Sequence, residues 1–202
     1  MKRLALITAI MALGLSGCLK NPFSTRGSQQ PVGSSGTWET PATPDVAIVN
    51  LFYAYNEKNI QNYEHCFDDT FRFSAPQDSV EAEAQGNGYL YQGWDKTIER
   101  QVTEGIFANF LQTGRYLDLL MVPSADYPDS IGDSTYVIYR DYTLRTIVSD
   151  TLGTDTTTFR GLAAFHLSQS AFSFWSIYLW EELPSEVVVH NWAQFKALYR
   201  TR

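Results

Sequence analysis

Apolar positions in the first half of the folded region repeat with the period of an α-helix. Behind Asp45 they recur three and four residues apart, and the same spacing returns behind Asp95. Aspartate is a favoured N-cap, so each pattern predicts an amphipathic helix that begins at an aspartate. The repeating positions are Ile48, Leu51, Phe52 and Tyr55 in the first helix and Ile98, Val102, Ile106 and Phe110 in the second. Between these helices we expect a short helix or turn at 60–66, a strand at 70–74 and a loop at 79–93.

From residue 116 onward the period of the pattern changes to two. Aromatic and β-branched residues alternate with polar ones, which predicts strands joined by polar loops in an antiparallel meander. The four expected strands are 116–122, 135–148, 159–169 and 172–182, with a loop at 149–157. Apolar residues around Trp192 predict a short helix in the C-terminal tail that closes against the body. Helices before strands indicate an α+β fold with the helices on one face of a curved sheet.

Several segments between residues 45 and 183 combine into a larger pattern. They are Val46–Tyr55, Phe71-Arg72-Phe73, Trp94, Arg160-Gly161-x-Ala163-x-Phe165-x-Leu167 and Trp175-x-Ile177-x-x-Trp180-x-Glu182. In order and spacing this pattern resembles the nuclear transport factor 2-like superfamily, the cone-shaped fold shared with ketosteroid isomerase and polyketide cyclase-like proteins. The resemblance implies helices packed on the concave face of a curved antiparallel sheet, with a ligand pocket between them. A lipocalin-like barrel is the main alternative, and it would need more strands and fewer early helices.

The first eighteen residues have the organisation of an export signal. Lys2 and Arg3 precede an apolar run at 4–15, which is too short to span a bilayer because a spanning helix needs about 20 apolar residues. Leu15-Ser16-Gly17-Cys18 then closes the segment. This ending resembles the lipobox of bacterial lipoproteins, which implies that a leader of residues 1–17 is removed and that Cys18 carries acyl chains such as palmitate. Two or more such chains hold a protein stably on membrane lipid.

The residues after Cys18 indicate the destination and the domain plan. Leu19 and Lys20 differ from the aspartate that retains lipoproteins in the inner membrane under the family's sorting rule, so the outer membrane is favoured if the cell has one. Residues 18–44 are rich in Pro, Gly, Ser and Thr and are expected to form a flexible tether. Within it, Trp38 either is exposed or docks on the domain. The folded domain is expected at 45–184, followed by a helical tail at 185–202.

Charge and cysteine content exclude several classes of partner. Without Lys2 and Arg3 the chain has 13 basic and 22 acidic residues, a net charge of −9, and no cluster of Lys and Arg. Phosphate backbones require a basic footprint, so nucleic acid is not an expected partner. With Cys18 lipidated, Cys66 is the remaining thiol and no intrachain disulfide can form. We expect Cys66 to be a buried small apolar residue rather than a nucleophile or an interchain link.

Three polar residues of the predicted strands are weak candidates for catalysis. If the 149–157 loop is centred near 152–153, Tyr139 pairs with His166, and Asp141 lies nearby on the same face. In ketosteroid isomerase-like enzymes, an Asp base and a Tyr donor in an apolar cavity move a proton next to a carbonyl. The alternative is a structural cluster or a solvent-facing row, since Arg145 would share this face.

Binding candidates are mainly aromatic, and we expect no metal or cofactor. His65-Cys66-x-Asp68-Asp69 contains ligand types, but its spacing matches neither a zinc site nor a calcium loop. No glycine-rich phosphate loop or nucleophile elbow is present in the sequence. The candidates for lining a pocket are Tyr55, Tyr91, Trp94, Tyr178 and Trp180.

The pattern as a whole favours binding over catalysis. We expect a membrane-anchored envelope lipoprotein, facing the periplasm or the cell surface, that binds a small apolar molecule or an envelope protein through the cone cavity or the sheet face. One alternative is an isomerase or cyclase that uses Asp141, Tyr139 and His166. Another is a structural envelope subunit that forms a homodimer through the sheet face, since the superfamily often dimerises that way.

Overall fold

The computed structural model describes residues 36–132, 135–151, 153–184 and 190–200. The predicted leader, Cys18 and the first part of the tether lie outside the described residues. The helices are α2 (Pro44–Asn56), α3 (Ile60–His65), α4 (Pro76–Ala84), the 3-10 turn η1 (Gly88–Leu90), α5 (Lys96–Phe110) and α6 (Trp192–Ala197). The strands are β1 (Phe67–Ser74), β2 (Arg115–Pro123), β3 (Ser130–Ile131), β4 (Thr135–Asp150), β5 (Gly153–Gln169) and β6 (Trp175–Leu183). None of the helices in these ranges is long and apolar enough to cross a membrane.

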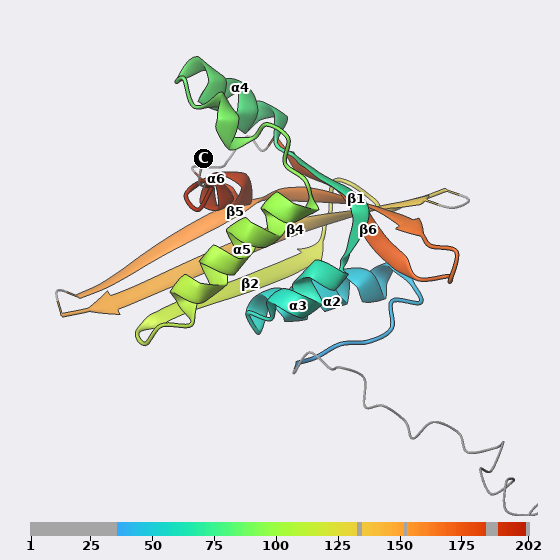
Figure 1. Ribbon diagram of the computed structural model, residues 1–202, viewed down its shortest axis with the longest axis horizontal. Coiled ribbons are helices and arrows are strands. Elements are labelled where there is room, and N and C mark those ends of the chain that lie inside the picture. Colours follow the sequence, from blue (N-terminus) through green and yellow to red (C-terminus); the bar gives the residue numbers. More distant parts are fainter. Residues whose placement is uncertain (1–35, 133–134, 152, 185–189, 201–202) are drawn as a thin grey trace, which may run out of the picture. The chain divides into compact units, whose positions relative to one another are not determined.

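The strands form a single curved and unclosed sheet in the order β1-β6-β5-β4-β2, with β3 added beside β4. All neighbours pair antiparallel except β1 and β6, which are parallel. Helices α2, α5 and α6 pack on one face of this sheet, and α3 joins α2 and α5 there (Figure 1). The predicted fold class, α+β with the helices on the concave face of a curved antiparallel sheet, is therefore confirmed.

Burial along β4 shows which side chains point toward the helices. Ile138, Arg140, Tyr142 and Leu144 are buried, and the odd-numbered residues between them point to the outward face. Buried side chains of β5 and β6, such as Phe165 and Trp180, extend the apolar surface of the concave face. This face and the apolar stripes of α2 and α5 form one core, to which Leu51 and Ile106 contribute fully buried side chains.

Two predicted loops are wrong. Residues 154–158 continue β5 instead of forming a loop, because threonine has a high strand propensity, and Asp150 pairs directly with Gly153. Residues 79–93 contain the end of α4 and the turn η1. Pro76 occupies the first turn of α4 and Asp78 follows it, both of which favour helix initiation. The apolar signal there is weak, since Ala82 is the one apolar residue of α4 that is buried.

Segments at both ends of the domain pack against it. Chain segment 36–43 lies on α2 and β6, where the amide of Asn50 pairs with the backbone of Glu39, and Trp175 N donates to the Pro41 carbonyl at 2.8 Å. Trp38 contacts the ring of His65 with 5.8 Å between centroids, so it docks on the domain and remains about one third exposed. The predicted C-terminal helix is confirmed as α6, which closes on the core.

Candidate functional site

The concave side of the sheet is filled by the protein's own aromatic side chains. Trp192 of α6 reaches between the sheet and the helices, with its ring centroid 4.5 Å from Trp180 on β6 and 4.9 Å from Tyr55 on α2. Trp94, in the segment before α5, is also buried and contacts Phe73 on β1. Three of the predicted pocket-lining residues, Tyr55, Trp94 and Trp180, therefore lie in the packed core.

A buried ion pair lies among these rings. Lys196 of α6 is fully buried, and its Nζ is 2.8 Å from Oε1 of Glu99 on α5, which is equally buried. Glu99 also accepts hydrogen bonds from Tyr63 Oη at 2.5 Å and from Trp94 Nε1 at 2.7 Å. Burial lowers the pKa of Lys196 to about 8, although the Glu99 carboxylate opposes this change.

A second buried carboxylate, Glu182 on β6, lies near the first cluster. The Tyr142 hydroxyl donates a hydrogen bond to Glu182 Oε1 and accepts one from Trp192 N at 2.7 Å. Glu182 Oε2 has no hydrogen-bond partner among the described residues. Burial raises the pKa of Glu182 to about 8, while the Tyr142 hydrogen bond and the Lys196 charge act in the opposite direction.

These polar residues were not predicted from the sequence, although a signal for two of them exists. Glu99 precedes Val102 by three residues and Ile106 by seven, so it lies on the apolar stripe of α5. Glu182 alternates with Trp180 on the inward face of β6. A carboxylate on an apolar face indicates a buried polar partner. Lys196 had no such signal, because lysine is rarely buried and α6 is short.

The three catalytic candidates lie on the outward face of the sheet. The predicted pairing is wrong by two residues, since Tyr139 pairs with Ala164 and Asp141 with Leu162. A shift of two preserves the face, so both residues still share it with His166. His166 Nε2 is 2.7 Å from Oε2 of Glu181. The structure thus places the three residues opposite the helix-covered face, and their catalytic use stays a prediction.

The other two pocket-lining candidates lie apart from each other. Tyr178 is half-buried on the outward face, where its ring contacts His166 with 6.0 Å between centroids. Tyr91 is half-buried and lines a polar pocket of about 210 Å³ between α4, η1 and α6. In this pocket Asp78 accepts hydrogen bonds from Asn191 and Gln194, each at 2.8 Å, which ties α6 to α4.

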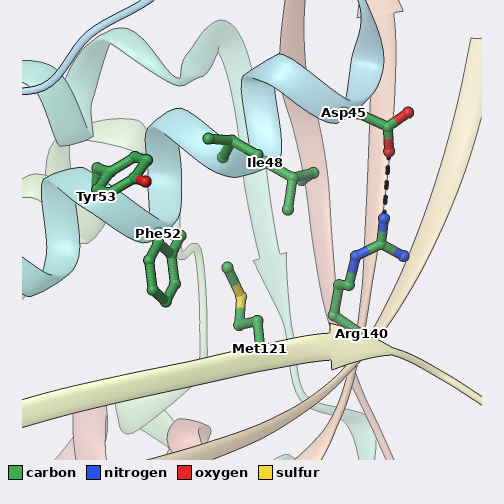
Figure 2. A pocket seen from close by; sticks show the side chains of 7 residues that line it. Asp45, Ile48, Phe52, Tyr53, Met121 and Arg140 are labelled. Atoms are coloured by element: carbon green, nitrogen blue, oxygen red, sulfur yellow. Dashed lines mark hydrogen bonds and ion pairs between the residues drawn. The ribbon is translucent and has the colours of Figure 1, made fainter.

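A larger and more apolar pocket lies between α2 and the strands β2 and β4 (Figure 2). Its volume is about 270 Å³. Ile48 and Phe52 of α2 face Met121 of β2, and Arg140 of β4 lies at one end beside Asp45 (Figure 2). The remaining lining residues are Val49 and Tyr53, whose exposed side chains stand on α2. We call this the α2–β2 pocket.

Electrostatics distinguish the two ends of the α2–β2 pocket. Arg140 Nη1 is 3.0 Å from Asp129, and Arg140 Nη2 is 3.4 Å from Asp45. The Arg140 side chain is one-tenth exposed, whereas that of Asp45 is about seven-tenths exposed. The contact with Asp45 is therefore long and solvated, and Arg140 forms the cationic end of the pocket.

Neither metal-binding residues nor a reactive thiol appear in the described part of the chain. No group of three or more His, Cys, Asp or Glu residues there has the arrangement of a metal site. Cys66 is buried as expected, its thiol lies 3.3 Å from the Asn62 carbonyl oxygen, and burial raises its pKa. A thiol in this setting is a poor nucleophile.

Comparisons with other proteins give similarity in structure alone. No family model matches the chain, and no curated protein matches its sequence. A conserved protein from Planctomyces limnophilus has a TM-score of 0.50 and 12% identity, over 70% of this chain and 94% of its own. A nuclear transport factor 2-like superfamily protein from Salmonella enterica gives 0.45 and 12%, over 71% and 89%. A ketosteroid isomerase-like protein from Erwinia carotovora gives 0.46 and 12%, over 72% and 97%.

Proposed function

We propose that this chain is an exported lipoprotein, anchored to a membrane through acyl chains on Cys18, that binds a small apolar molecule in the α2–β2 pocket. The observation that carries the binding site is the contrast between two regions of the domain. The space around Trp192 is filled by the rings of Trp180 and Tyr55, whereas the α2–β2 pocket is unfilled and has apolar side chains away from its Asp45 and Arg140 end. Small-molecule sites are typically such concave, mostly apolar surfaces with a few polar groups that orient the ligand.

The charges at the Arg140 end favour a neutral ligand. One guanidinium lies between the two carboxylates of Asp45 and Asp129, and the whole chain has a net charge of −7. An anionic head group would be repelled by both carboxylates. A carbonyl or hydroxyl oxygen instead accepts a hydrogen bond from Arg140 Nη2 when Asp45 turns into solvent. The proposed ligand class is therefore an apolar body that carries a neutral hydrogen-bond acceptor.

Nile red tests this proposal, because the dye is apolar and neutral and carries a carbonyl group. Its fluorescence increases in apolar surroundings. We expect saturable Nile red fluorescence with the full chain. Met121→Lys should raise the dissociation constant for Nile red at least tenfold. An apolar ligand would have to bury the new ammonium group beside Ile48 and Phe52, which costs free energy. Val80→Lys is the matched control, because Val80 is 69% exposed on α4 and outside the pocket. Equal binding by the two variants, or no saturable signal, contradicts the proposed site.

The lipid anchor has a separate test. Intact-mass analysis of the protein purified from membranes of its source cell should give a chain that begins at Cys18 and carries acyl mass. Cys18→Ser should give a chain that carries no acyl mass and retains the leader. A mature chain with an unmodified Cys18 would overturn the anchoring proposal and leave the pocket proposal standing.

A further inference from the structure

We propose that the space beneath α6 is a binding site for a primary alkylammonium group, and that Lys196 occupies this site as an internal ligand. The inference is independent of the α2–β2 pocket, because none of the residues that line that pocket contacts Lys196. It depends on three observations. Aromatic rings surround the ammonium, the carboxylate that binds it is positioned by residues outside α6, and the charges buried beside it are acidic.

Aromatic rings surround the Lys196 ammonium. Its Nζ lies 3.3 Å from the centroid of the Trp180 ring, 4.1 Å from that of Phe73 and 5.6 Å from that of Trp192. All of these separations are within the range of about 6 Å over which a cation is attracted to the face of an aromatic ring. The lysine and the indoles of Trp180 and Trp192 are fully buried. This is the geometry with which proteins recognise ammonium ligands in aromatic cages.

The carboxylate of the site is positioned without any group from α6. Glu99 is held by the Tyr63 hydroxyl from α3 and by the Trp94 indole from the segment before α5. Tyr63 Oη donates to Glu99 Oε1 and Trp94 Nε1 donates to Oε2. Lys196 Nζ lies 2.8 Å from Oε1 as an ion pair without hydrogen-bond geometry. Removal of the lysine side chain would therefore leave a positioned and buried carboxylate together with the rings of Trp180, Phe73 and Trp192.

The buried charges give the site its preference for a cation. Glu99 and Glu182 both act electrostatically on Lys196, which is the one cationic side chain buried with them in the described part of the chain. Glu182 Oε2 also lacks a hydrogen-bond partner there. An anionic or purely apolar occupant would leave the buried Glu99 carboxylate without a compensating cation, at a cost in free energy. The ligand class is thus a protonated primary amine on an unbranched alkyl chain.

Chemical rescue of a truncated lysine tests the proposal in the full chain. Lys196→Ala retains Cβ, so propylammonium supplies the missing atoms from Cγ to Nζ. We expect Lys196→Ala to lower the unfolding midpoint by about 10 °C, because one partner of a buried ion pair is lost. Propylammonium chloride should restore about 5 °C or more in a saturable manner, and sodium chloride at equal ionic strength should not. Circular dichroism during the titration extends the test to a variant that is unfolded without ligand.

Three controls separate ammonium recognition from cavity filling. Propanol has nearly the same shape without the charge and should give no rescue. Lys196→Met fills the space with apolar atoms and should not respond to propylammonium. The double variant Lys196→Ala with Glu99→Gln should lose most of the rescue, because the ammonium loses its carboxylate. Rescue by propanol equal to that by propylammonium, or no recovery of midpoint or structure with propylammonium, would overturn the proposal.

Discussion

Replacement of Glu182 by glutamine should change how the stability of the domain depends on pH. In the folded state burial raises the pKa of Glu182 to about 8, from an ordinary value of 4.5. Between these two values the unfolded chain has lost the proton that the folded chain still holds. The unfolded state therefore binds fewer protons, and the free energy of unfolding falls as the pH rises from 4.5 to 8. Glutamine does not titrate, so this part of the slope should disappear.

The size of the effect follows from the shift in pKa. One pKa unit corresponds to about 1.4 kcal/mol, so a shift from 4.5 to about 8 sets an upper limit of about 5 kcal/mol. Lys196 changes the pH dependence of stability in the same direction. The Glu182 carboxylate raises the pKa of Lys196, so replacing Glu182 by glutamine favours the neutral amine of Lys196. In the wild type, the lowered pKa of Lys196 makes stability rise again between about 8 and 10.5. The wild-type curve should therefore have its minimum near pH 8.

Urea denaturation at pH 5 and pH 8 measures this difference. At pH 5 the free energy of unfolding of Glu182→Gln should equal that of the wild type. At pH 8 it should exceed the wild-type value by about 2 kcal/mol or more. Glu83→Gln is the matched control, since Glu83 is an exposed carboxylate on α4 and should give the same small difference at both pH values. A Glu182→Gln variant that is equally destabilised at both pH values would refute the reasoning, because the carboxylate would then act through its ionised form throughout.

Three further predictions concern the core, the sheet edge and the thiol. Trp192→Ala should lower the free energy of unfolding by about 3–5 kcal/mol in urea denaturation, and a loss below about 1 kcal/mol would mean that α6 is dispensable. Asn56→Ala should lower the free energy of unfolding by about 1–3 kcal/mol and speed amide hydrogen exchange at Leu119. The reason is that the Asn56 side-chain amide forms hydrogen bonds with both the N–H and the carbonyl of Leu119 on the edge strand β2. Unchanged exchange at Leu119 would contradict this. Cys66 should react with Ellman's reagent only after unfolding, because the thiol is buried, and rapid stoichiometric reaction of the native protein would count against that assignment.

The elements that the sequence predicted well are those in which one local rule dominates. The helices behind Asp45 and Asp95 have long apolar stripes, and β4 has clear alternation. Register was harder, because it depends on where a turn lies within a run of polar residues. All five residues at 154–158 are threonine or aspartate and four of them are exposed, so their hydropathy resembles that of a loop although their backbone belongs to β5.

The candidate site was harder to predict than the fold. Aromatic residues such as Tyr55 and Trp180 were predicted to line a pocket and instead lie in the packed core, because hydropathy alone cannot distinguish a ring that lines a cavity from one that fills it. The difference is made by α6, whose Trp192 and Lys196 are distant in sequence from the residues that they contact. Only the tertiary arrangement brings a lysine from the last turn of the chain onto the stripe of α5.

The position of α6 after every strand of the sheet has a consequence for biosynthesis. Its side chains complete the core, so a nascent chain in which α6 is still inside the ribosome lacks the Trp192 and Lys196 side chains that pack beneath it. The domain cannot close until α6 has emerged. For a chain that begins with the proposed leader this delay is useful, since a secretory channel threads only unfolded polypeptide.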